Sequence, residues 1–187
     1  DAVTQARQKL EAYNGVFISD VVGLGKTYIC AMLANSFNRN TYKLFICPPV
    51  LVDYWKSVLQ EFDVARCDVI SLGKLDKVIE RGIEKYSYIF VDEAHRFRNS
   101  DTESFAELHQ ICHGKKVILI SATPINNYTS DIENQIYLFQ SRQNGTINGI
   151  KNIEGFFKGL NAKLAKKKKG SSAYMEQLRE NSEIIRD

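Results

Sequence analysis

The sequence predicts an α/β fold, in which helices flank a mainly parallel sheet and a helical appendage follows at the C-terminal end. Two observations carry this prediction. Residues 1–140 alternate short apolar runs with amphipathic stretches, which is typical of βαβ units and of a sheet covered on both faces. After Gln140 the chain becomes polar and rich in Gly and Asn, and no further strand is indicated. We therefore expect an α/β lobe at 1–140 and a helical insertion or linker at 141–187.

Short apolar runs mark the expected strands. They cover residues 15–19, 43–47, 67–71, 88–92 and 116–121. Because a parallel sheet of this kind binds its ligands at the carboxyl ends of its strands, the segments that directly follow these runs are the first places to look for a site.

The stretches between the runs carry apolar residues at spacings of three and four, which predicts helices. The expected helices cover 26–37, 51–62, 74–85 and 101–111, with 153–166 and 173–185 in the appendage. Ser100 with Glu103 forms a capping-box pattern that predicts the start of one helix, and Ser130 with Glu133 predicts the start of another.

The composition is that of a soluble globular protein, with 44% hydrophobic and 25% charged residues. No apolar run approaches the roughly 18 residues that cross a bilayer, and no signal-peptide pattern opens the chain. The cysteines lie far apart without a CxxC pair, which argues against zinc and favours a reducing, cytoplasmic location, associated with the nucleoid if the source is bacterial.

The charge is distributed unevenly along the chain. Residues 1–140 carry 15 Lys and Arg against 17 Asp and Glu, whereas residues 141–187 carry 10 against 5. The basic excess lies mostly in Lys163 and in 166–169. Such a run either meets phosphates or forms a solvated loop, and the second interpretation is the more common.

The segment DVVGLGKT (20–27) lies between an expected strand and an expected helix. The backbone N–H groups of a glycine-containing turn and the positive end of the following helix surround phosphate oxygens. In such loops the lysine reaches the β- and γ-phosphates and the next hydroxyl binds Mg²⁺, roles that fall here to Lys26 and Thr27. Gly23 and Gly25 would let the backbone approach the ligand closely.

The acidic segment VDEAH (91–95) directly follows an apolar run, so Asp92 is expected at the tip of a strand. A carboxylate there holds the Mg²⁺ shell, and the adjacent Glu93 is placed to orient and deprotonate the attacking water. Taken alone, such a pair is usually a solvated strand end. Its occurrence together with the phosphate loop favours the catalytic interpretation.

A third segment, SATPINN (121–127), follows the last expected strand. Ser121 and Thr123 carry short hydroxyls that can bond across to the acidic segment. In isolation this piece is equally well explained as a proline turn.

Together these motifs resemble the superfamily 2 helicases, and within them the Swi/Snf-like DNA translocases. The general phosphate-loop pattern begins with glycine, but the loop of this branch begins with aspartate and reads D-x-x-G-L-G-K-T, which matches Asp20, Gly23 and Leu24. CPPVLVDYWKSVLQEF (47–62) resembles segment Ia of the family, and VISLGKL (69–75) stands where segment Ib is expected.

The later motifs extend the resemblance. DEAHRFRN (92–99) is similar to the extended DEAH box, including Arg96 and Asn99. ISATPINN, followed by a helix that ends in YLF (137–139), resembles segment III. The resemblance covers about residues 1–140.

The resemblance implies a RecA-like P-loop domain, the first lobe of a motor that uses ATP and Mg²⁺ to move on double-stranded DNA. Its site residues would have distinct roles. Catalysis would fall to Lys26, Asp92 and Glu93, coupling to His95, Ser121 and Thr123, and strand contacts to Pro48, Pro49 and Ser71. Motifs IV to VI of a second RecA-like lobe are missing, and with them the arginine that completes the ATP site. The adenine-reading glutamine is not identified, since Gln5 and Gln8 have doubtful spacing.

Three alternatives stay open at this point. The first is an RNA helicase or a strand-separating DNA helicase, against which Asp20 and Leu24 argue. The second is a P-loop ATPase or kinase unrelated to nucleic acid, which leaves segments Ia and III unexplained. The third is a silent scaffold, against which the intact Lys26, Asp92 and Glu93 argue.

Overall fold

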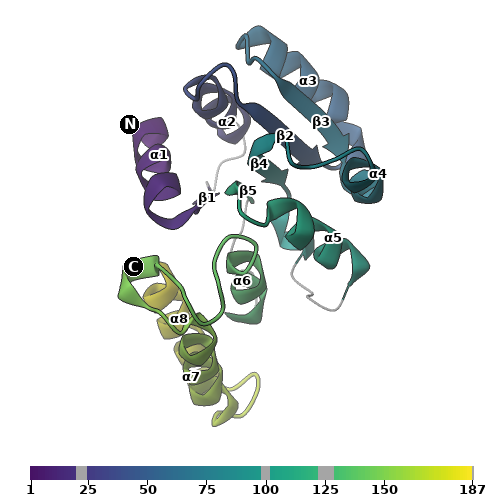
Figure 1. Ribbon diagram of the computed structural model, residues 1–187. Helices are drawn as coiled ribbons and strands as arrows, with labels where there is room; N and C mark the ends of the chain where they lie inside the picture. The colour runs from purple at the N-terminus through teal and green to yellow at the C-terminus, as the bar shows by residue number, and fades with distance from the viewer. Residues whose placement is uncertain (20–24, 98–101, 122–128, 187) are drawn as a thin grey trace.

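The computed structural model describes residues 1–19, 25–97, 102–121 and 129–186 (Figure 1). Its centre is a parallel five-stranded sheet with the strand order β1-β5-β4-β2-β3. The strands are β1 (Gly15–Ile18), β2 (Tyr42–Cys47), β3 (Cys67–Ser71), β4 (Tyr86–Asp92) and β5 (Lys116–Ile120). The expected α/β architecture is therefore confirmed, and each expected strand is present within two residues of its expected start.

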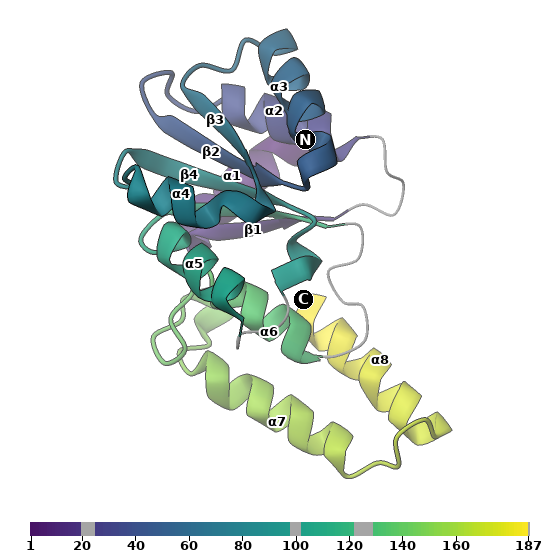
Figure 2. The same ribbon diagram turned by 90° about the vertical axis from the view of Figure 1, so that its right-hand side faces the viewer.

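Helices cover both faces of the sheet (Figures 1 and 2). One face carries α1 (Ala2–Tyr13), α2 (Lys26–Asn35) and α3 (Val52–Glu61), and the other carries α4 (Leu75–Glu80) and α5 (Glu103–Cys112). The chain crosses the sheet from β1 to β3 and then returns through β4 to β5. Because such crossovers are right-handed, the change of direction places the later helices on the opposite face.

Alternation along the strands divides the core into two apolar layers. On β2, Phe45 and Cys47 pack towards α2 and α3, whereas Leu44 and Ile46 pack towards α4 and α5. The central strands are buried on both faces, which explains why they read as uninterrupted apolar runs.

The helix boundaries at α4, α5 and α6 (Thr129–Ile136) differ from the expectation in ways that the structure explains. Helix α4 ends at Glu80 rather than near residue 85, because Gly82 adopts a left-handed φ of 91°. Helix α5 is capped by Thr102, whose side chain accepts a hydrogen bond from the amide of Phe105 (3.3 Å), so the predicted cap at Ser100 is wrong. Helix α6 begins before Ser130, which therefore lies inside the helix and does not cap it.

Helix α1 was not expected from the sequence. It buries only Ala6 and Leu10, so its apolar periodicity is weak. The Asp1 side chain caps it by accepting from the amide of Thr4 (2.8 Å). The structure therefore adds a helix before β1. Its packing against the core, rather than an apolar pattern in the sequence, accounts for this helix.

The two appendage helices are confirmed as α7 (Ile153–Ala165) and α8 (Ser172–Arg186). They lie with α6 below the sheet, and α6 and α7 share a third apolar cluster centred on Ile136 and Phe157 (Figure 2). The side chain of Asn181 is fully buried and donates to the carbonyl of Leu160 (3.2 Å), which ties α8 to α7. The division of the chain at residue 140 stays a prediction.

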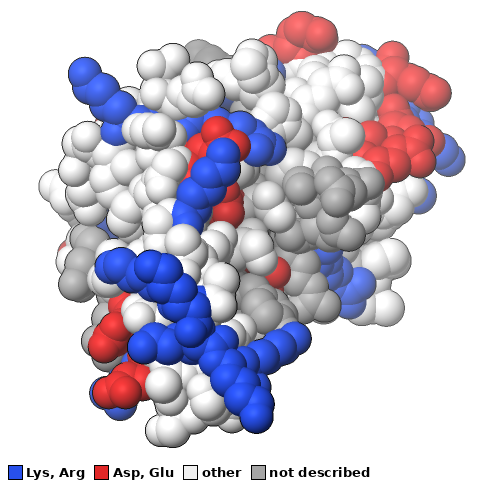
Figure 3. Space-filling view, turned by 90° about the horizontal axis from the view of Figure 1, so that it is seen from below, with Lys and Arg blue, Asp and Glu red and all other residues white. Residues whose placement is uncertain are grey.

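The loop between α7 and α8 carries the basic run. Lys163 and the lysines at 166–169 are exposed, and Lys and Arg side chains gather on the face of the molecule seen from below (Figure 3). No helix in the described parts of the chain is long and apolar enough to cross a membrane.

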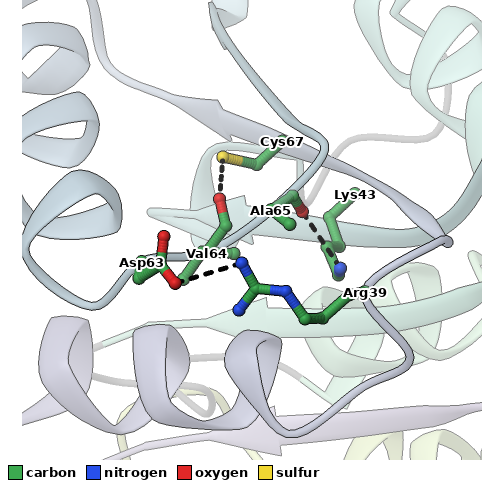
Figure 4. A network of polar contacts seen from close by, with 6 residues as sticks. All are labelled: Arg39, Lys43, Asp63, Val64, Ala65 and Cys67. Carbon is green, nitrogen blue, oxygen red and sulfur yellow. Dashed lines mark hydrogen bonds and ion pairs between the residues drawn. The ribbon is translucent and has the colours of Figure 1, made fainter.

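The amino edge of the sheet is closed by polar contacts to the main chain (Figure 4). The ammonium of Lys43, on β2, is buried and donates to the carbonyl of Ala65 (3.1 Å). Burial lowers the pKa of Lys43. Nearby, Arg39 pairs with Asp63 (3.0 Å), and the Cys67 thiol donates to the carbonyl of Val64 (3.3 Å). These contacts fasten the loops that enter β2 and β3.

Candidate active site at the carboxyl edge

Three neighbouring strands bring the motif segments to one place. In the register of the sheet, Ile120 of β5 lies opposite both Ile18 of β1 and Asp92 of β4. The amide of Ser121 then donates to the carbonyl of Ile18 (3.3 Å). The segments that follow β1, β4 and β5 therefore leave the sheet side by side at its carboxyl edge.

The start of α2 carries the predicted phosphate-binding residues Lys26 and Thr27. Lys26 and Thr27 form its first turn and are half-buried, and Gly25 precedes it without a side chain to cap the N–H groups. The first N–H groups of a helix have no partner within the helix, and they lie at the positive end of its dipole. Asp20, Gly23 and Leu24, which were also assigned to phosphate binding, lie outside the described residues.

Gly25 precedes α2 with a φ of −102°, which any residue adopts. Among the described residues, only Ile29 would approach a Cβ atom added there, at 3.8 Å from its Cδ1, an ordinary contact. The described part of the chain therefore does not itself require glycine at this position. Close approach of a ligand stays the role predicted for Gly25.

The carboxylate of Asp92 is held by two donors. The indole Nε1 of Trp55 donates to Oδ2 (2.9 Å), and the amide of Glu93 donates to Oδ1 (2.8 Å). Burial raises the pKa of Asp92, while these two hydrogen bonds and the positive charge of Lys26 act in the opposite direction. The carboxylate is therefore half-buried, fixed in orientation and close enough to Lys26 to feel its charge.

Glu93 has an unusual backbone. Its φ is 55°, in the left-handed region that non-glycine residues rarely adopt and that clusters at functional sites. This turn at the end of β4 brings Glu93 Oε2 to 3.1 Å from Nδ1 of His95, in the short helix η3 (Ala94–Phe97). The left-handed residue is therefore the one whose carboxylate contacts His95.

His95 links the acidic segment to β5. Its Nδ1 lies 3.4 Å from Oγ of Ser121, which is buried. The same nitrogen contacts Glu93, so the acidic segment and the segment after β5 meet at Nδ1 of His95. Thr123, the other hydroxyl assigned to coupling, lies outside the described residues.

Two thiols lie next to the site. Burial raises the pKa of Cys30 and, with the negative charge of Asp92 acting in the same direction, raises the pKa of Cys47 to about 12. Both thiols are therefore protonated near neutral pH, and they serve as packing beneath the carboxylate.

The candidate nucleic-acid contacts lie on the other half of the carboxyl edge. Cys47 and Ser71 are register partners, so Pro48 and Ser71 end two neighbouring strands. Pro49 is exposed in η1 (Pro49–Leu51), whereas Pro48 and Ser71 are buried. The short helix η2 (Leu72–Lys74) follows Ser71. The structure thus brings these residues together at the ends of β2 and β3.

Sequence reasoning missed Trp55 as a site residue. Its spacing on α3 indicated only membership of the apolar stripe. The one available signal was that a buried indole N–H needs a hydrogen-bond acceptor. The spacing of residues along the sequence does not identify that acceptor.

The chain matches the model of the SNF2-related domain over residues 68–178. This match extends past residue 140, so the family resemblance is wider than the first 140 residues. In sequence, the chain is 28% identical over 164 residues to the uncharacterized ATP-dependent helicase YqhH of Bacillus subtilis, covering 76% of this chain and 29% of that protein. It is 24% identical over 159 residues to Protein CHROMATIN REMODELING 24 of Arabidopsis thaliana, covering 63% and 14%. The chain thus spans less than a third of the length of these relatives.

Solved structures agree in fold. The SWI2/SNF2 ATPase core of Sulfolobus solfataricus, solved in complex with dsDNA, superposes with a TM-score of 0.69 at 21% identity, covering 95% of this chain and 40% of that one. The Hef helicase domain of Pyrococcus furiosus gives 0.56 at 19% identity, covering 73% and 35%. The sheet and its flanking helices are those of a RecA-like lobe. Because the family model matches more than half of its residues, the chain belongs to the SNF2-related domain family.

Proposed function

We propose that the chain is the ATP-binding first lobe of a motor that couples ATP hydrolysis to movement on duplex DNA. One observation carries this proposal: the start of α2, the Asp92–Glu93 pair and Ser121 lie at the ends of three adjacent strands, and His95 connects the last two. Family membership supports the same conclusion, because relatives carry the names ATP-dependent helicase and chromatin remodelling protein.

In this proposal the nucleotide phosphates lie at the start of α2. Lys26 binds the β- and γ-phosphates, and Mg²⁺ is held by the hydroxyl of Thr27 and the carboxylate of Asp92. These are hard oxygen donors of the kind that Mg²⁺ prefers, and this ion commonly uses only one or two protein ligands beside waters and phosphates. Each Asp92 oxygen accepts one hydrogen bond and keeps further acceptor capacity, so the donor set fits the ion.

Glu93 is the residue that we assign to the attacking water. The Glu93 carboxylate contacts His95, whereas that of Asp92 is held by Trp55 and the Glu93 amide, so we assign Asp92 to the metal and Glu93 to proton transfer. We assign His95, Ser121 and Thr123 to coupling, because the Glu93–His95–Ser121 contacts join the hydrolytic carboxylate to the segment after β5.

The nucleic acid is assigned to the ends of β2 and β3, where Pro49 is exposed beside the buried Pro48 and Ser71. The structure of the Sulfolobus neighbour was solved with dsDNA, which favours duplex DNA over other nucleic acids. We further propose that a second RecA-like lobe supplies the arginine that completes the ATP site. Such a residue contributes on the order of 10³–10⁵ in rate, so this chain alone should hydrolyse almost no ATP. We place the protein in the cytoplasm, at the nucleoid if the source is bacterial.

The test is ATP turnover by the complete two-lobed protein with duplex DNA, single-stranded DNA or RNA, each at the same stated salt concentration. Strong stimulation by duplex DNA is expected. If RNA or single-stranded DNA stimulates turnover and duplex DNA does not, the assignment of the ATP site would stand. The motor would then be an RNA helicase or a strand-separating helicase rather than a duplex translocase. No turnover with any of the three, from a folded protein that binds ATP, would contradict the proposal.

A further inference from the structure

We infer that Trp55 is a positioning residue for Asp92 and connects the segment after β2 to the nucleotide site. This inference rests on the proposed function, because it gives a role to a residue that acts through the proposed Mg²⁺ ligand. The starting observation is the 2.9 Å hydrogen bond from the indole Nε1 to Asp92 Oδ2. Trp55 is 1% exposed, so this N–H is withdrawn from solvent and depends on Asp92 for its partner.

The indole is held by aromatic packing across two strands. Its ring lies 5.3 Å from that of Phe45, and Phe45 stacks on Phe90 with 4.2 Å between the centroids and 10° between the planes. Phe45 and Phe90 are also register partners, and Phe90 precedes Asp92 by two residues on β4. The donor and the acceptor are therefore fixed to the same part of the sheet, and the bond has little freedom to change its direction.

The two donors to Asp92 define the plane of the carboxylate. Trp55 holds Oδ2 while the amide of Glu93 holds Oδ1 (2.8 Å). Each oxygen has a lone pair left over. A carboxylate held in this way meets an incoming cation without reorienting, which is how outer donors tune the ligands of a metal.

The position of Trp55 along the chain gives the bond a second consequence. Helix α3 begins directly after η1, which contains the exposed Pro49 at the end of β2. Trp55 lies in the first turn of α3, so its hydrogen bond ties the segment after β2, where the DNA contact is proposed, to the proposed metal ligand Asp92.

The first experiment needs no substitution, because the chain contains a single tryptophan. Its indole N–H gives one resonance in a ¹H–¹⁵N spectrum of the 187-residue chain. We expect this resonance to shift when Mg²⁺ and a non-hydrolysable ATP analogue are added together, and to stay in place with Mg²⁺ alone. An unmoved resonance, in a sample whose other amides show that Mg²⁺–nucleotide is bound, would overturn the inference.

The second experiment removes the donor and keeps a ring. Trp55→Phe should weaken nucleotide affinity in the presence of Mg²⁺ by roughly tenfold, the loss expected for one hydrogen bond to a charged group. Affinity measured in EDTA should not change. Tyr54→Phe, a change at the exposed neighbouring position, is the matched control and should alter neither value.

The role through Asp92 is isolated by a double-mutant cycle. On an Asp92→Asn background, Trp55→Phe should cause no further loss of Mg²⁺-dependent affinity. Equal losses on both backgrounds, or a loss in EDTA as well, would show that Trp55 serves only the general fold. Absence of nucleotide binding by the unsubstituted chain would instead overturn the proposed function, and the inference with it.

Discussion

The two edges of the sheet use their polar residues in opposite ways. At the amino edge, lysines close the fold by donating to main-chain carbonyls: Lys43 to Ala65, Lys115 to Ile83 and Lys116 to Leu10. At the carboxyl edge, Asp92 accepts one hydrogen bond from the Trp55 indole and one from the Glu93 amide. Each of its two oxygens keeps the capacity to accept another.

The backbone does not distinguish the edges. Glu93 at the carboxyl edge has a φ of 55°, but Asn14 (61°) and Arg66 (52°), which directly precede β1 and β3 at the amino edge, are left-handed as well. The difference lies in the hydrogen bonds: polar groups that the main chain satisfies stabilise the fold, whereas groups with remaining hydrogen-bonding capacity are typical of functional sites. Burial of a polar residue therefore does not by itself identify a functional site, since Lys43 at the amino edge is as buried as Ser121 at the carboxyl edge.

The largest effect is expected at the carboxyl edge from Glu93→Gln. This change removes the proposed base and keeps the shape of the side chain, so ATP turnover by the complete protein should fall about 10²–10⁴-fold. Nucleotide affinity should be retained. If the variant turns over ATP at the rate of the unsubstituted protein, Glu93 is not the general base.

Lys26→Ala should have the next largest effect. Without the ammonium that clamps the phosphates, turnover should fall roughly 10²–10³-fold and nucleotide binding should weaken with it. Equilibrium titration with a fluorescent ATP analogue measures the binding. Lys9→Ala, at an exposed position of α1, is the control and should behave as the unsubstituted protein.

Lys116→Met tests the amino edge, where the effect should be on stability alone. The Lys116 ammonium donates to the carbonyl of Leu10 (2.9 Å) and to Asn14 Oδ1 (3.0 Å), at the C-terminal end of α1. Losing these bonds and the favourable charge at a helix end should lower the free energy of unfolding by about 1–2 kcal/mol. Urea unfolding measures this value. A change in nucleotide affinity at unchanged stability would contradict the division between the edges.

The smallest effect is expected from Asp68→Asn, and it should depend on pH. Burial opposes ionisation of Asp68, but hydrogen bonds from Lys85 (2.8 Å) and Tyr86 (2.6 Å) outweigh it and lower the pKa of Asp68. A lowered folded-state pKa contributes stability above the unfolded-state pKa, and this contribution is lost as pH falls through the folded-state value.

The ion pair is about half exposed, so solvent screening limits its contribution to roughly 0.2–1 kcal/mol. The difference in unfolding free energy between Asp68→Asn and the unsubstituted chain should therefore be present at pH 7 and vanish in acid. A difference that stays constant from pH 7 down through the acid range would show that the charge of Asp68 is not its cause.

The fold was largely predictable because buried parallel strands leave a strong local signal. The apolar runs located β2 and β3 to within one residue. The helix ends were less predictable, since Thr102 and Ser100 are equivalent as caps until the chain is placed in space. Helix α1, which buries only Ala6 and Leu10, left a periodic signal too weak to predict it.

The candidate site divides in the same way. Local motifs indicated Lys26, Asp92 and Glu93, because phosphate binding, metal binding and proton transfer each need a particular residue type at a fixed place after a strand. The bond from Trp55 depends on how α3 lies over β2 and β4, and no spacing in the sequence contains this information. The left-handed φ of Glu93 was likewise invisible, since it reflects how the chain leaves the sheet.

The most direct test of the division between the edges is a titration of the ¹⁵N-labelled chain with Mg²⁺ and a non-hydrolysable ATP analogue, followed through its amide resonances. The proposed site predicts that the shifts concentrate at the carboxyl edge, on the amides of Lys26, Thr27, Asp92 and Ser121. The amides of Lys43, Asp68 and Lys116 at the amino edge should stay in place. Shifts centred on the amino edge, or none at a concentration of analogue that saturates the complete protein, would contradict the assignment of the nucleotide site.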